Sequence, residues 1–333
     1  MNLSVNTPKH IDFLLIVRGL AAVSVIYWHL GGYLIRDDYI LSFLIVPGRL
    51  AVWIFFMMSG YLIGYGLIYG RYRSTLKGIA TFWFNRLLRI YPIFITVSIV
   101  AIIATNPIID FNFISRELLV VQWNHDYLLN GVFWTLGLET HFYLIAPLLV
   151  FGYQKIFNKY TRHWFLLYLT TLIILWIYYE SSYFQNWDIR NILGGISQFA
   201  IGITMAGYKD QIDSIRNKKN VIILVSILTI FSILLFNHYY GINPGTIILS
   251  HIIGAGLIVL HILLEKEKKD SNFLIRALMI LGVLSYGVYA WHGLLATNGL
   301  LMDNLLLHAF SAIVLAYITY KLVEQPVSKW KKI

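Results

Sequence analysis

Runs of apolar residues recur along the whole chain of 333 residues and are separated by short polar segments. Each run approaches the ~20 residues that an α-helix needs to cross the hydrocarbon core of a bilayer. We predict ten such helices, at residues 12–35, 42–66, 88–105, 132–152, 163–179, 191–208, 220–237, 245–264, 274–298 and 304–322. The pattern therefore predicts an all-α, polytopic integral membrane protein.

The composition supports this class. The chain is 58% hydrophobic and only 13% charged, whereas soluble domains carry about 25% charged residues. It has no cysteine, which excludes disulfide and thiol chemistry. Because none of the polar segments is long enough to fold alone, we expect residues 1–333 to form a single membrane-embedded domain without a separate periplasmic domain.

The basic residues predict the orientation of the chain. If the N-terminus is cytoplasmic, 21 of the 26 Lys and Arg residues fall on the cytoplasmic side, as the positive-inside rule requires. The bias favours an even number of spans, with both termini in the cytoplasm. The net charge of +10 is then explained by this topology and by anionic membrane lipids, and no nucleic-acid partner is expected.

The first predicted helix contains an arginine and a histidine, although an ionisable group inside a membrane costs roughly 2.5–3.5 kcal/mol and commonly marks function. Arg18 and His29 are eleven residues apart. At about 100° and 1.5 Å per residue, their side chains share a face and lie about 16 Å apart along the axis. One helix thus carries a cation near one membrane face and a titratable imidazole toward the other.

A carboxylate lies at a comparable depth in the fourth predicted helix. In this topology Glu139 and His29 both lie about 9–10 Å below the outer surface. A carboxylate and an imidazole at matched depth can form an acid/base pair, in which the carboxylate selects the tautomer. The alternative is a structural ion pair of Glu139 with an arginine. His141 points elsewhere and is interpreted as a core residue.

Two arginines lie at the cytoplasmic entry to the third predicted span. Arg86 and Arg89 are three residues apart and share a helix face. Two guanidiniums in this arrangement can hold a phosphate. The alternative is an anchor at the membrane surface, with side chains that reach out to the headgroups.

Two further segments are open to a structural or a functional interpretation. Ser59-Gly60 in the second span could permit close packing of helices or contribute to a site. His292, at the end of the segment Ser285–His292, shares the outer depth of His29 and Glu139. A metal site of His29, His141 and His292 is disfavoured by their different depths.

Together these segments resemble the acyltransferase 3 family of polytopic membrane O-acyltransferases over nearly the whole chain. Six pieces occur in the family's order: Arg18-Gly19-Leu20-Ala21-Ala22 with His29, Phe55-Phe56-x-x-Ser59-Gly60, Arg86-x-x-Arg89 with Tyr91-Pro92, Trp134-Thr135-Leu136-x-x-Glu139 with Phe142-Tyr143, Ser285-Tyr286 through Trp291-His292, and Glu324-Gln325-Pro326. The chain departs from the family at Leu15 and at Trp53-Ile54, where members often carry aspartate.

The resemblance implies transfer of an acyl group to a sugar hydroxyl of a cell-surface glycan, such as O-antigen lipopolysaccharide or exopolysaccharide. The donor is expected to be acyl-CoA, commonly acetyl-CoA, which approaches from the cytoplasm. The acceptor is expected to be a glycan or a lipid-linked glycan. The resemblance places the protein in a bacterial inner membrane and implies no metal cofactor.

The resemblance also implies roles for individual residues. The catalytic residues would be His29, Glu139 and Arg18; the donor would be held by Arg86, Arg89, Arg18 and Ser59; the acceptor would be bound by Trp134, Tyr286 and His292. His29 would act as a general base or as a transient acyl carrier. The rival hypothesis is a transporter or flippase for a glycan or lipid-linked substrate, but the sequence shows no clear inverted repeats or paired broken helices.

Overall fold

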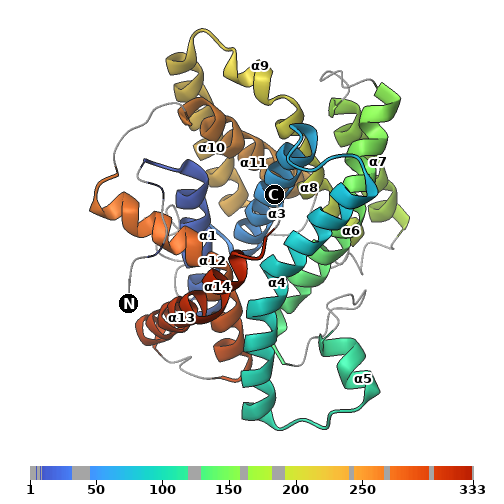
Figure 1. The fold of residues 1–333 in the computed structure, drawn as a ribbon. Helices are drawn as coiled ribbons and strands as arrows, with labels where there is room; N and C mark the ends of the chain where they lie inside the picture. The colour runs from blue at the N-terminus through green and yellow to red at the C-terminus, as the bar shows by residue number, and fades with distance from the viewer. Residues whose placement is uncertain are drawn as a thin grey trace.

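The computed structural model describes residues 5, 8, 10–31, 46–118, 129–157, 164–181, 192–239, 244–265, 271–299 and 304–331. These residues form a helical bundle (Figure 1). The main helices are α1 (Phe13–Gly31), α3 (Gly48–Ile68), α4 (Leu76–Thr105), α6 (Trp134–Phe157), α7 (Trp164–Ser181), α8 (Ile192–Gly207), α10 (Lys218–His238), α11 (Pro244–Leu264), α12 (Phe273–Thr297) and α13 (Leu305–Thr319). Shorter elements are α5 (Phe111–Phe113), η1 (Ile114–Leu118), η2 (Gly131–Phe133), α9 (Lys209–Asp213), η4 (Tyr320–Glu324) and α14 (Gln325–Ser328).

A helix occupies each of the ten ranges predicted from the sequence. Seven helices in the described part of the chain are long and apolar enough to cross a membrane, and Phe13–His29 and Gly195–Gly207 are shorter apolar helices. The all-α, multi-pass membrane fold is therefore confirmed. The count of ten spans and the side on which the termini lie stay predictions.

The helix α3 occupies the centre of the bundle. It packs against α1, α6, α8 and α11. In its 18-residue apolar stretch, 72% of the residues are buried, compared with 17% in the corresponding stretch of α10. Figure 1 shows α7 and α10 at the periphery. Apolar side chains on the outer surfaces of these two helices are exposed. They are suited to contact with lipid tails, which are equally apolar.

Glycines bring two pairs of helices into close contact. A Cβ atom on Gly19 of α1 would meet the backbone of Leu278 in α12, and one on Gly282 would meet the backbone of Leu15. Gly60 of α3 lies in the same way against the backbone of Phe199 in α8. Small residues allow such close approach between membrane helices. The close contacts hold Arg18 and Ser59, the neighbours of two of these glycines, at fixed positions in the bundle.

The helix α4 begins earlier than predicted. It starts at Leu76, not near residue 88, and the side chain of Thr75 caps it by accepting a hydrogen bond from the Gly78 amide at 3.1 Å. The predicted range 88–105 covers only the more apolar, C-terminal part of this helix. The additional turns place Arg86 and Arg89 within a continuous helix, where they can face the bundle interior.

Candidate active site

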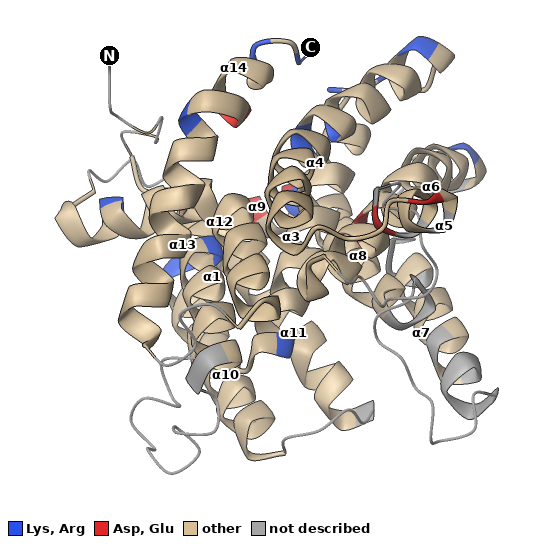
Figure 2. Cartoon of the chain, turned by 90° about the horizontal axis from the view of Figure 1, so that it is seen from below, with Lys and Arg blue, Asp and Glu red and all other residues tan. Residues whose placement is uncertain are grey.

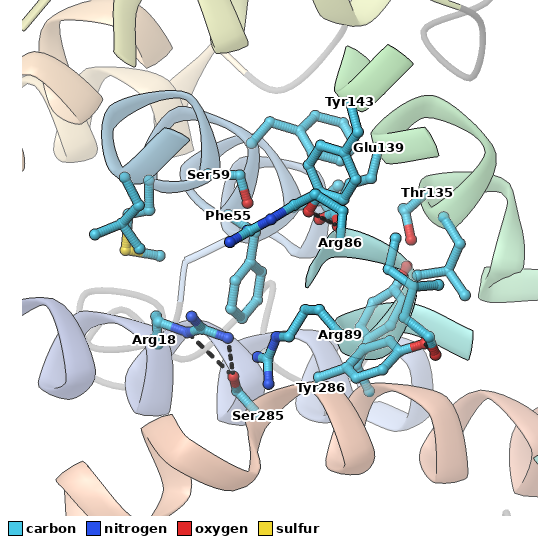
Figure 3. Close-up of a pocket in the computed structure, with 17 residues that line it drawn as sticks. Arg18, Phe55, Ser59, Arg86, Arg89, Thr135, Glu139, Tyr143, Ser285 and Tyr286 are labelled. Atoms are coloured by element: carbon cyan, nitrogen blue, oxygen red, sulfur yellow. Dashed lines mark hydrogen bonds between the residues drawn. The ribbon is translucent and has the colours of Figure 1, made fainter. Parts of the chain in front are cut away.

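A cavity of about 100 Å³ lies inside the bundle, where side chains from α1, α3, α4, α6 and α12 converge (Figure 3). Its polar lining consists of Arg18, Ser59, Arg86, Arg89, Thr135, Glu139, Tyr143, Ser285, Tyr286 and Tyr289, and its apolar lining consists of Val52, Phe55, Phe56, Met58, Leu62, Ile90 and Leu136. The cavity is somewhat smaller than the ~150 Å³ site that admits benzene in an engineered protein. It therefore suits a small polar or anionic group.

Arg18 reaches this cavity from α1 and is held by α12. Its Nε and Nη2 atoms donate hydrogen bonds to the Ser285 hydroxyl, at 3.3 and 3.0 Å. Hydrogen bonds from a charged donor are stronger than neutral ones. Ser285 thus orients the guanidinium toward the cavity, as Figure 3 shows.

Arg89 forms an ion pair across the bundle. Its Nη1 atom lies 3.1 Å from Oε1 of Glu324 in η4, and its guanidinium lies over the Tyr286 ring, 5.6 Å from the centroid. The Tyr286 hydroxyl in turn donates to the carbonyl of Ile90 at 2.7 Å. A π-helical turn such as η4 often occurs at a functional site, and here it places Glu324, the first residue of the Glu-Gln-Pro motif, beside Arg89.

Arg86 is enclosed by aromatic rings. Its guanidinium lies 5.6 Å from the Phe82 centroid and 5.7 Å from the Tyr143 centroid, and its buried Nε atom has no hydrogen-bond partner among the described residues. A surface anchor would extend toward the headgroups, whereas Arg86 and Arg89 both line the interior cavity. The two arginines therefore face the interior of the bundle, and their binding of a phosphate stays a prediction.

Glu139 enters the cavity from α6. Its Oε2 atom accepts a hydrogen bond of 2.6 Å from the Tyr143 hydroxyl, one turn further along the helix. Among the described residues, ion pairs join Arg89 to Glu324, Lys209 to Glu265 and Lys218 to Asp213, and Glu139 is in none of these three. The carboxylate shares the cavity with three arginines without binding one directly.

The structure does not bring His29 and Glu139 together. His29 lies near the end of α1 and contacts His292 of α12, with 3.4 Å between His29 Nδ1 and His292 Nε2 and 5.2 Å between the ring centroids. Neither histidine lines the cavity that contains Glu139 and Arg18. The matched depth predicted for His29 and Glu139 therefore did not produce a contact, because depth does not determine which helices are neighbours.

The remaining candidates divide between the cavity and its supports. Ser59 and Tyr286 line the cavity, whereas Trp134 packs edge-on against Phe56, with 6.4 Å between the centroids. Neither Tyr143 nor Glu324 was predicted to be a site residue, although both lie within the family motifs. The i, i+4 spacing of Glu139 and Tyr143 could have indicated their contact on one helix face. Arg89, the partner of Glu324, is too distant in the sequence for their contact to be inferred.

Other histidines lie apart from this cavity. His141 Nδ1 lies 2.7 Å from the carbonyl of Gly137 on its own helix. No group of three or more His, Cys, Asp or Glu side chains that could hold a metal is found in the part of the chain that the structure describes.

The end of the bundle near the C-terminus is basic, and Figure 2 shows Lys and Arg on α4 and in the segments that flank α14. Lys331 lies there, beyond the last apolar helix. Burial, together with the positive charge of Arg89, Arg86 and Arg71, lowers the pKa of Lys331 to about 8, although Glu324 acts in the opposite direction. These cations are therefore close enough to act on one another.

The fold and the site define a multi-pass membrane protein with an arginine-rich cavity inside its helical bundle. A model of the acyltransferase domain matches residues 11–320 of the chain. The chain therefore belongs to this acyltransferase family, as the motifs predicted.

Two similar proteins place the chain among its relatives. An uncharacterized protein of Haemophilus influenzae is 28% identical over 240 residues, which cover 62% of this chain and 96% of that protein. The O-acetyltransferase OatA of Staphylococcus aureus is 24% identical over 370 residues, which cover 97% of this chain and 58% of OatA. The chain thus spans little more than half the length of OatA. No solved structure matches the chain.

Proposed function

We propose that the protein is a membrane O-acyltransferase that transfers an acyl group, with acetyl as the first candidate, from acyl-CoA to a hydroxyl of a cell-surface glycan. The family and the similarity to OatA support O-acetyl transfer. The acceptor would be O-antigen, exopolysaccharide or a lipid-linked precursor, and the membrane would be the bacterial inner membrane.

One observation carries this proposal: the cavity holds an excess of positive charge inside a membrane bundle. Arg18, Arg86 and Arg89 are accompanied by Glu139 and by Glu324, the counter-ion of Arg89. Three guanidiniums against two carboxylates leave one positive charge without a carboxylate. A buried charge of this kind is costly unless it is paired, and an anionic substrate such as the phosphates of acyl-CoA supplies the partner.

The basic end of the bundle supports the approach of that donor. Arg71, Arg86 and Arg89 each act electrostatically on Lys331 there, and clustered cations raise the local concentration of an anionic ligand. In this proposal the phosphates of acyl-CoA bind at the arginines, and the thioester extends along α1 toward His29. Arg18 and His29 mark these two levels, about 16 Å apart along the helix.

The proposed chemistry is direct transfer with general-base catalysis. His29 accepts the proton of the acceptor hydroxyl while the oxygen attacks the thioester carbonyl carbon. The tetrahedral intermediate then expels the CoA thiolate, which takes up the proton held by His29, so that the new ester is released and His29 is neutral again. Preorganised donors near the developing oxyanion would lower the barrier. Glu139 reduces the net positive charge of the arginine cavity without cancelling it.

Mass spectrometry of the host glycan tests the proposal. Cells that express the wild-type protein are expected to carry an alkali-labile acyl group that is absent from cells with Arg86→Gln or His29→Ala at equal membrane levels. Arg276→Gln, which changes an exposed arginine of α12, is the matched control and should retain the modification. If the glycan is unmodified in all strains, or if Arg86→Gln and His29→Ala modify it fully, the proposal is wrong.

A further inference from the structure

Two backbone carbonyls determine the tautomers of the neutral histidine pair at the end of α1. His29 Nδ1 lies 2.9 Å from the carbonyl oxygen of Val25, and His292 Nδ1 lies 3.2 Å from that of Val288. A carbonyl oxygen only accepts hydrogen bonds, so each Nδ1 must carry the proton. The lone pair of each neutral imidazole then lies on Nε2.

This assignment makes the contact between the two rings directional. His29 Nδ1–H is a shared donor: its shorter branch goes to the Val25 carbonyl at 2.9 Å, and its longer branch goes to the acceptor His292 Nε2 at 3.4 Å. The opposite direction is excluded for neutral rings, because His292 has only one proton and Val288 takes it. His29 Nε2 is left with its lone pair, and no hydrogen bond reaches it from any residue that the structure describes.

The two rings differ in accessibility. His292 is fully buried, next to the Tyr289 ring at 5.3 Å between centroids, whereas the His29 side chain is exposed. A glycan hydroxyl can therefore approach His29 but not His292. Whatever His292 contributes to the reaction must pass through His29.

We propose that His292 is a positioning residue that holds the His29 ring with Nε2 available as the general base and accepts a hydrogen bond from Nδ1 as His29 becomes protonated. This inference rests on the proposed function and assigns His292 a role other than contact with the acceptor. When Nε2 takes the proton of the acceptor hydroxyl, the ring becomes an imidazolium with two N–H donors. Its Nδ1–H bond to His292 then becomes charge-assisted and stronger.

Kinetics of acyl transfer by purified protein in nanodiscs test this role. His292→Leu removes the acceptor, and we expect kcat to fall roughly 10- to 100-fold, as for loss of a hydrogen bond to a charged group, while KM for acetyl-CoA stays within about twofold. His292→Gln places an amide oxygen within reach of His29 and should recover part of the loss. His251→Leu, which removes another buried histidine, should keep kcat per folded molecule.

Two kinetic results would overturn the inference: an unchanged kcat in His292→Leu, or equal losses in the Leu and Gln variants. A defect of folding alone would lower the amount of active protein without this difference between variants at equal folded protein. The stoichiometry of radiolabelled acetyl-CoA binding measures that amount.

Nitrogen NMR gives a reading that needs no activity. Protein labelled with ¹⁵N-histidine shows different shifts for protonated and unprotonated ring nitrogens, and the His29 signals are identified by their loss in His29→Gln. We expect neutral His29 to carry its proton on Nδ1. The Nε2–H tautomer would refute the inference even if the protein transfers acyl groups. If the Nδ1–H tautomer is found but no transfer occurs, the proposed function is what fails.

Discussion

The ion pair between Arg89 and Glu324 gives the most quantitative prediction of stability. The charges are 3.1 Å apart, which corresponds to about 5 kcal/mol at an effective dielectric constant of ~20. The side chains are 25% and 11% exposed, so screening reduces this value. Glu324→Gln removes the negative charge and leaves Arg89 beside Arg18 and Arg86. We expect it to lower the free energy of unfolding by about 3 kcal/mol.

A double-mutant cycle isolates the pair. Unfolding in mixed detergent and SDS micelles, followed by tryptophan fluorescence, would be measured for Glu324→Gln, Arg89→Gln and the double variant. The coupling energy should be about 2–3 kcal/mol. The control cycle uses Lys209 and Glu265, which are 3.8 Å apart with a carboxylate that is 51% exposed, and should give less than ~1 kcal/mol. Equal coupling in the two cycles would refute the argument.

Three further predictions follow from individual contacts. Gly60→Ala should destabilise the protein by about 1–3 kcal/mol, because the added Cβ meets the backbone of α8. Gly152→Ala, whose Cβ would have nothing within 4 Å, should leave stability unchanged. Thermal unfolding in detergent measures the stability of both variants. Tyr143→Phe removes the 2.6 Å hydrogen bond to Glu139 and should lower acyl transfer by roughly tenfold or more, and an unchanged rate would exclude a role for that bond. Folding lowers the pKa of Lys331 from 10.5 to about 8, so stability should rise as the pH increases between these values; Lys331→Met should remove this part of the pH dependence, and parallel pH profiles would contradict it.

Much of the fold could be predicted because the apolar runs are long and bilayer thickness constrains their length. The relative direction of the side chains on α1 was also predictable, because each residue of an α-helix turns by about 100°. Arg18 and His29 were expected on one face, and both contact α12, through Ser285 and His292. The start of α4 was not predictable from hydropathy, because Lys77, Thr81, Asn85 and Arg86 interrupt its first turns, and the helix begins at the cap formed by Thr75.

The partners of the site residues could be predicted only where they lie on the same helix. Tyr143 is one turn from Glu139; Glu324 is 235 residues from Arg89, and only the packed bundle brings them together. Ser59 and Gly60 show why the two interpretations of their motif were both reasonable: Ser59 lines the cavity, and Gly60 packs against α8.

Binding of acetyl-CoA to the purified protein tests the central claim most directly. Equilibrium binding of radiolabelled acetyl-CoA would be compared for the wild type, for a variant with both Arg86→Gln and Arg89→Gln, and for the exposed control Arg276→Gln, with folding of each verified. We expect the wild type and the control to bind equally and the double variant to bind at least about tenfold more weakly, a loss of about 1.4 kcal/mol or more. Equal binding by all three proteins would contradict the assignment of the arginine cavity to the acyl donor.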